Sequence, residues 1–280
     1  MTPRQELVER AKREGKKPRR KVAPPARRPE REIRTHRARL RDIRRAIERA
    51  IRDRVFPEIE GILSEAGTRS DRERVGGWTD RLADLFTATR SSLDPVLQDA
   101  AEEIESVGDR IAERATEEQV KQIRAVIGVE PSFYDDDTIR GLVDSWKREN
   151  NAFIRRYADE AVEEMQDAVQ RGVRSGRPTR EIQRELRDRF GITDRRAERI
   201  ARTEASLLNA QITQQRQRQL GIDRYVWRTS EDSRVRGEHE ERNGRVFRWD
   251  DPPFDGHPGE AVNCRCTYSP HLEDLIGEIE

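Results

Sequence analysis

Apolar residues recur at helical spacing along most of the first 220 residues, and arginine and glutamate fill many of the positions between them. From Ile33 to Ile62 the apolar positions follow steps of three, four and seven, which is typical of a long helix with one narrow apolar stripe. Pro57 lies inside this pattern, and we expect a kink there because proline lacks a backbone N–H group. A break is expected between Gly67 and Gly77.

The same spacing predicts further helices. Thr116 and Gln119 have the spacing of a capping box, which predicts a helix start, and Gly128 ends that helix. The clearest stripe runs from Ile139 to Val169. Stripes this narrow on a highly charged background suit helices that pack on partner proteins, and a helical bundle within the chain is the alternative. A helix from Thr179 should end at residues 190–191, before another that ends near residue 220.

The pattern becomes strand-like after Gly221. Two short runs, 225–227 and 246–249, flank Asn243-Gly244, a dipeptide typical of tight turns. Residues 263–268 predict another strand. The predicted fold class is therefore α+β, with a long, mostly helical N-terminal region followed by a small α+β domain with short antiparallel strands.

Composition narrows the class of protein. Of 280 residues, 40% are charged and 33% are apolar, whereas globular domains average about 25% and about 45–50%. This balance excludes one large compact core and, with only two cysteines, a disulfide scaffold. No 18-residue apolar run occurs and no apolar segment follows Met1, so we expect neither a membrane span nor a signal peptide. The expected location is the cytosol or an assembly built there.

The net charge of +1 hides an uneven distribution. Residues 1–45 contain 18 Lys or Arg and 6 Asp or Glu, a balance of +12, so the remainder carries −11. The first 29 residues are also rich in proline and poor in apolar side chains. Such a segment predicts a disordered basic arm at 1–30, with a polyanion as partner or with only a solubilising role. The other expected ranges are a helical region at 31–164 and a C-terminal domain at 165–280.

Cys264 and Cys266 are separated by one residue, so on an extended strand both thiols would point to the same face. With His239 and His257 they could form a Cys₂His₂ zinc site. The spacing is not that of a standard zinc finger. Two buried thiols in a β core, with the histidines in hydrogen bonds, is the other interpretation.

An enzymatic alternative uses Arg202, Glu204, Arg236 and His239. Glu204 would be a general base, His239 an acid and an arginine a phosphate ligand. The chain has no P-loop, dinucleotide-binding glycine motif, His-Glu-x-x-His sequence or nucleophile elbow. Charged residues in so charged a chain usually form solvated faces or structural pairs, so we predict no catalytic residues.

Short motifs follow one another in a fixed order between residues 165 and 280, and together they resemble phage head morphogenesis proteins of the Mu F-like minor head type. Asn243-Gly244 stands where many relatives have Asp-Gly, and either dipeptide makes the turn. The residues that carry the resemblance are Arg202, Thr203, Glu204, Trp227, Asp232, Arg234, Arg236, His239, Asn243, Gly244, Pro258, Gly259, Asn263, Cys264, Arg265 and Cys266.

The resemblance implies a structural minor capsid protein of a tailed phage, inside the capsid near the portal. Such a protein assists head morphogenesis, DNA packaging or DNA delivery. The implied partners are the portal protein or the major capsid protein, with packaged DNA on the N-terminal basic arm. The implied location is the virion, and the host cytoplasm during assembly. The alternatives are a phage-delivered transferase-like or nuclease-like enzyme and a DNA-binding module outside any virus.

Overall fold

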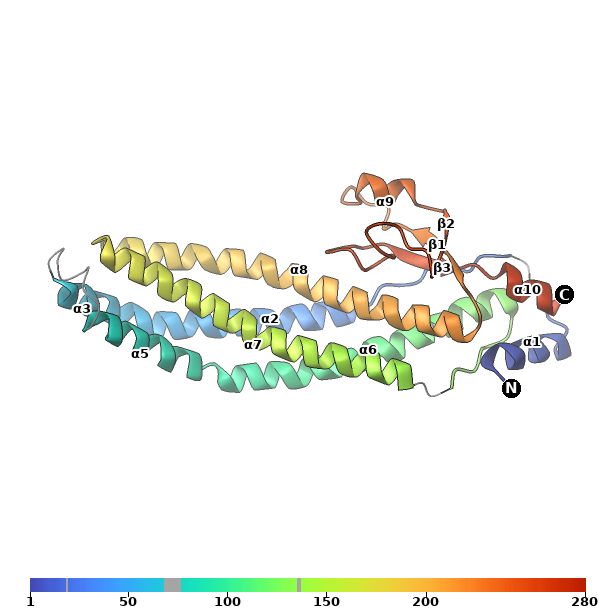
Figure 1. The fold of residues 1–280 in the computed structure, drawn as a ribbon, viewed down its shortest axis with the longest axis horizontal. Coiled ribbons are helices and arrows are strands. Elements are labelled where there is room, and N and C mark those ends of the chain that lie inside the picture. Colours follow the sequence, from blue (N-terminus) through green and yellow to red (C-terminus); the bar gives the residue numbers. More distant parts are fainter. Residues whose placement is uncertain (19, 68–76, 135–136) are drawn as a thin grey trace. The chain divides into compact units, whose positions relative to one another are not determined.

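The chain folds into a series of helices followed by a small antiparallel sheet (Figure 1). This computed structural model describes residues 1–18, 20–67, 77–134 and 137–280, and of 191–194 only the backbone. The elements are α1 (Pro3–Arg13), α2 (Glu30–Ala50), the π-helix η1 (Ile51–Val55), α3 (Phe56–Ala66), α5 (Trp78–Ser91), α6 (Asp94–Ile127), α7 (Asp137–Arg174), α8 (Thr179–Gln219), β1 (Arg224–Arg228), α9 (Gly237–Glu241), β2 (Val246–Arg248), β3 (Thr267–Pro270) and α10 (Glu273–Ile279). The α+β prediction is confirmed.

Two compact units form, and neither is continuous in sequence. Unit 1 contains Met1–Arg34, Ser106–Lys147 and Arg199–Glu280, and unit 2 contains Thr35–Glu105 and Arg148–Glu198. The ranges 1–30, 31–164 and 165–280 stay a prediction about separable domains. No helix in the described part of the chain has the length and apolar character that crossing a bilayer requires.

The stripe predicted from Ile33 onward is buried in the chain itself. Ile43, Ile47 and Ile59 have at most 1% of their surface exposed, which fits the bundle interpretation. Near Pro57 the helix does change: η1 ends at Val55, two residues before the proline, and the Phe56 N–H group bonds to the Ile51 carbonyl five residues back. Proline cannot donate to the carbonyl four residues before it and clashes with it, so the turn widens.

Two predicted helix boundaries are wrong. Helix α6 passes through Thr116 without interruption, and α8 continues through Gly191. One glycine costs a helix only about 1 kcal/mol relative to alanine, which the flanking turns of a 41-residue helix can offset. Almost all of the break expected between Gly67 and Gly77 lies outside the described residues.

The first 30 residues differ from the expected disordered arm. Helix α1 begins with a capping box between Thr2 and Gln5, and its buried Leu7, Val8 and Ala11 join one apolar cluster with residues of α6 and α10. Composition suggested too little apolar surface for folding. The three apolar residues share one helix face, and together they pack against apolar residues of α6 and α10.

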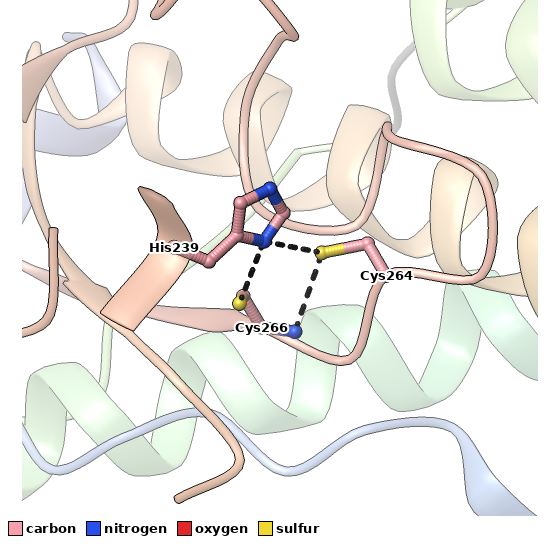
Figure 2. A group of neighbouring side chains, drawn as sticks. All are labelled: His239, Cys264 and Cys266. Carbon is pink, nitrogen blue, oxygen red and sulfur yellow. Dashed lines mark hydrogen bonds between the residues drawn. The ribbon is translucent and has the colours of Figure 1, made fainter. Parts of the chain in front are cut away.

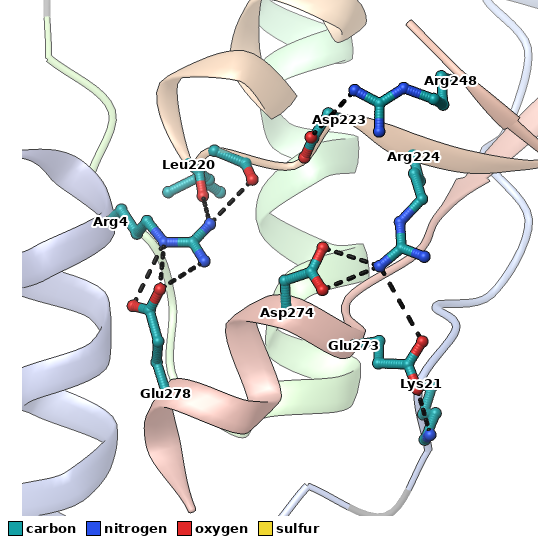
Figure 3. A network of polar contacts seen from close by, with 10 residues as sticks. Arg4, Lys21, Leu220, Asp223, Arg224, Arg248, Glu273, Asp274 and Glu278 are labelled. Atoms are coloured by element: carbon teal, nitrogen blue, oxygen red, sulfur yellow. Dashed lines mark hydrogen bonds and ion pairs between the residues drawn. The ribbon is translucent and has the colours of Figure 1, made fainter.

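Polar contacts fix the same region (Figure 3). Arg4 donates to the carbonyls of Leu220 (2.8 Å) and Gly221 (2.9 Å) and pairs with Glu278 at 2.7 Å. Gly221 has φ +61°, and a Cβ there would lie 2.6 Å from the Arg4 guanidinium. Glycine at 221 therefore permits both the turn and the approach of α1.

The sheet has the strand order β2-β1-β3, all antiparallel, with Tyr225 opposite Phe247 on one side and Pro270 on the other. The N-terminal segment continues the sheet beyond β3. The Ala23 and Ala26 N–H groups donate to the carbonyls of Pro270 (3.2 Å) and Tyr268 (3.1 Å). These bonds satisfy backbone acceptors on an edge that would otherwise invite pairing with another chain.

Three buried glutamines connect the helices of unit 1 to the sheet. Gln217 on α8 accepts from Trp249 Nε1 (2.9 Å) and donates to Gln119 on α6 (3.1 Å). Gln119 donates to Gln122 (2.8 Å), which donates to the Pro24 carbonyl (2.6 Å). All three side chains are at most 2% exposed.

We predict that His36 makes stability depend on pH. It is fully buried in α2, and burial lowers its pKa from 6.5 to about 4. Below about pH 6.5, His36 therefore binds a proton in the unfolded chain but not in the native state. Stability should be full above that pH and fall by about 1.4 kcal/mol per unit down to about pH 4, roughly 3 kcal/mol in total.

Urea unfolding at several pH values checks this. The unfolding free energy of the native protein minus that of His36→Gln should shrink by about 3 kcal/mol as pH falls through this window. Parallel pH profiles for the two proteins would show that His36 does not titrate as expected.

Candidate functional site

The two cysteines and His239 meet in the interior of the C-terminal segment (Figure 2). His239 Nδ1 lies 3.3 Å from Cys266 Sγ and 3.6 Å from Cys264 Sγ. The three side chains are at most 6% exposed. Both cysteines precede β3 rather than lie in it, since Asn263 has a left-handed φ of 61° and the strand begins at Thr267. The thiols converge even so.

His257 takes a different place. Its Nδ1 is 2.9 Å from the Tyr225 hydroxyl, and its ring packs 4.8 Å from that of Trp249. Burial lowers the pKa of His257. The structure thus brings together three members of the predicted zinc set and places the fourth in the aromatic core.

An acidic residue that the sequence analysis did not single out, Asp255, contacts the ring nitrogen of His239 that faces away from the cysteines. Asp255 lies 2.8 Å from His239 Nε2, and Arg242 donates to its other oxygen at 2.6 Å. Burial alone would raise the pKa of Asp255, but the hydrogen bonds from His239 and Arg242 lower it below its usual value. Asp255 therefore stays ionised and favours the tautomer with a proton on Nε2, which leaves Nδ1 facing the sulfurs.

The two thiols differ in acidity. Hydrogen bonding from Cys266 lowers the pKa of Cys264 to about 5. Hydrogen bonding to Cys264, together with burial, raises the pKa of Cys266. Thiolate is the nucleophilic and metal-binding form of cysteine, and the hydrogen bond from Cys266 favours it on Cys264.

The arginines of the resemblance hold loops together. Arg265 pairs with both oxygens of Asp232 at 2.6 Å, and the Arg234 N–H group caps the same carboxylate at 2.9 Å. Arg202 donates to the Asn263 side chain at 2.6 Å, and Arg236 donates to a loop carbonyl at 2.7 Å.

The remaining motif residues set turns and close contacts. Asn243 accepts from the Thr229 N–H group, and the Gly244 N–H group bonds to the Trp227 carbonyl. Gly259 has φ +96°, and a Cβ there would lie 3.1 Å from the Ser206 carbonyl of α8. Pro258 precedes this glycine and is buried.

Thr203 on α8 accepts from the Asn263 N–H group at 2.9 Å, which anchors the loop before the cysteines.

A cavity of about 140 Å³ opens onto the cysteine–histidine cluster. Its lining includes Arg202, Arg236 and His239, three residues of the enzymatic alternative. Glu204 is not part of that lining, and its backbone carbonyl accepts from Trp146 Nε1. The structure therefore does not gather the four proposed catalytic side chains in one cleft.

A family model matches the part of the chain that contains this cluster. Residues 163–269 match the sequence model of the family described as "Phage Mu protein F like protein". The chain is 33% identical over 150 residues to an uncharacterized protein of Haemophilus influenzae, covering 52% of this chain and 34% of that protein. It is 29% identical over 141 residues to the NAD(+)–arginine ADP-ribosyltransferase EFV of Enterococcus faecalis, covering 45% and 29%.

The chain spans about a third of the length of these curated relatives. No solved structure matches it.

We predict that Gly259→Ala destabilises the protein by about 1–3 kcal/mol, because alanine resists the left-handed backbone and its Cβ crowds the Ser206 carbonyl. Gly237→Ala is the matched control, since its Cβ would meet nothing within 4 Å and should change stability by less than about 1 kcal/mol. Thermal unfolding measures both. Equal effects would show that the Gly259 contact is unimportant.

Proposed function

We propose that this chain is a minor structural protein of a tailed-phage head, because residues 163–269 match the model of the Mu F-like family of phage proteins. We place it inside the capsid near the portal, where it assists head morphogenesis and the packaging or delivery of DNA. Its partners are the portal protein or the major capsid protein. It reaches the virion from the host cytoplasm during assembly.

One observation supports a structural role above a catalytic one: the polar motif side chains bind other parts of the same unit. Arg265 donates hydrogen bonds to Asp232, Arg202 donates to Asn263, and Arg236 donates to a loop carbonyl. A catalytic arginine needs donors directed at a substrate. Here the donors organise the loops that surround the cysteines.

The similarity to an ADP-ribosyltransferase is the observation that favours the enzymatic alternative. The match covers only 29% of that protein, which is too little to assign its activity to this chain. Since Glu204 does not line the cavity beside Arg236 and His239, we favour the structural function.

Purified heads test the proposal. The chain should be present in far fewer copies than the major capsid protein, be protected from protease in intact heads, and cross-link to the portal. Its absence from purified heads would overturn the proposal.

A pair of variants links incorporation to the motif. Arg265→Ala breaks the pairing with Asp232 through an arginine that is only 8% exposed. Arg245 is exposed and lies outside the motif, so Arg245→Ala is the control. Arg265→Ala should reduce incorporation several-fold, and Arg245→Ala should not. Equal incorporation of the two variants would show that the Arg265–Asp232 pair is not needed for assembly.

We further propose that the N-terminal segment contacts packaged DNA. Helix α1 is folded, but Lys12, Arg13, Lys17 and Arg20 at its end and beyond are exposed. Duplex DNA binding should weaken steeply with salt, because phosphate contacts release counterions.

Changing these four residues to glutamine should lower the slope of log affinity against log salt by about 3–4. Glutamine at four exposed arginines of α7, Arg155, Arg156, Arg171 and Arg174, removes the same charge and should leave the slope unchanged. Equal losses in both variants would indicate attraction by overall charge only.

A further inference from the structure

We propose that His239, Cys264 and Cys266 form a zinc site in which Nδ1 of His239 and the two sulfurs are the protein ligands. The proposal does not depend on the function proposed above. It differs from the set expected from sequence, because His257 is bonded to Tyr225.

The two nitrogen–sulfur distances are close to those of a tetrahedral zinc shell. Zn–S bonds of about 2.3 Å and Zn–N bonds of about 2.0–2.1 Å place neighbouring sulfur and nitrogen ligands about 3.6 Å apart. The observed distances from Nδ1 to the two sulfurs are 3.3 and 3.6 Å. All three ligand atoms lie within 4.8 Å of one another, so small side-chain rotations complete the shell.

The surroundings orient the imidazole as metal sites do. Histidine ligands usually donate their second ring N–H group to a carboxylate, which fixes the tautomer and makes the ligand nitrogen more basic. Asp255 accepts at His239 Nε2, and Arg242 holds Asp255 in turn.

The chemistry of the donors selects the metal. Zinc binding would release the remaining thiol proton, so that both cysteines coordinate as thiolates. Two thiolates and one imidazole are soft to intermediate ligands, which zinc prefers and which calcium and magnesium do not. The fourth position would face the cavity of about 140 Å³ that these residues line. A water molecule occupies about 30 Å³ of liquid, so the cavity has room for one as the fourth ligand.

Such a site would join two parts of the C-terminal segment that are distant in sequence. His239 belongs to the short helix α9, whereas the cysteines precede β3, 25 and 27 residues later. A metal at this point would fasten the loops that carry Asp232, Arg236 and Arg265.

The test uses the full chain, reduced, loaded with zinc and dialysed. We expect about one zinc per chain by elemental analysis and a higher melting temperature with zinc than after chelation. Cobalt should replace zinc and give an intense near-ultraviolet thiolate-to-cobalt band. No bound zinc and no such band would overturn the proposal, whatever the variants do.

Variants identify the ligands. Cys264→Ser and His239→Gln should lose the bound metal. Asp255→Asn leaves all three ligands in place and should weaken zinc binding about 10–100-fold. His257→Gln and His271→Gln are the histidine controls and should keep one zinc each. Loss in His257→Gln equal to that in His239→Gln, or full zinc binding by Cys264→Ser, would contradict the ligand set.

Discussion

The arrangement of unit 1 depends on the buried chain of amides formed by Gln217, Gln119 and Gln122. Each amide accepts and donates in one direction, from Trp249, which directly follows β2, through α8 and α6 to the Pro24 carbonyl. A buried amide left without partners costs about 1–3 kcal/mol. Shifting either helix along its axis would orphan several groups at once. The helices, the sheet and the N-terminal segment therefore share a single register.

That register has a direct consequence for the cysteine–histidine cluster. Helix α8 contributes Thr203 and the Ser206 carbonyl, against which the loops around Asn263 and Gly259 are placed. The loops position the sulfurs and the short helix α9 positions His239. A small sheet with three short strands can hold a buried polar cluster because long helices provide its support.

Sequence patterns predicted features governed by neighbours in the chain. Alternation and turn residues located β1 and β2. The thiols of Cys264 and Cys266 do converge, but not through the strand geometry expected of them, because both residues precede β3. Sequence patterns failed where contacts between residues distant in sequence determine the local structure. Thr116 has the spacing of a cap, yet α6 continues and its hydroxyl accepts from Arg216 on α8. Asp255 was missed because it lies in an irregular proline- and glycine-rich loop, where no periodicity shows which side chain turns inward.

The packing of α1 against α10 has to wait until α10 has been synthesised. Arg4 and Glu278 form an ion pair across 274 residues of sequence, so at synthesis rates of about 5–20 residues per second their encounter is delayed by on the order of 15 to 55 s. During that interval Leu7, Val8 and Ala11 have emerged from the ribosome without the apolar surface of α10 that covers them in the finished protein. Helix α1 therefore completes its packing only after α10 has been synthesised.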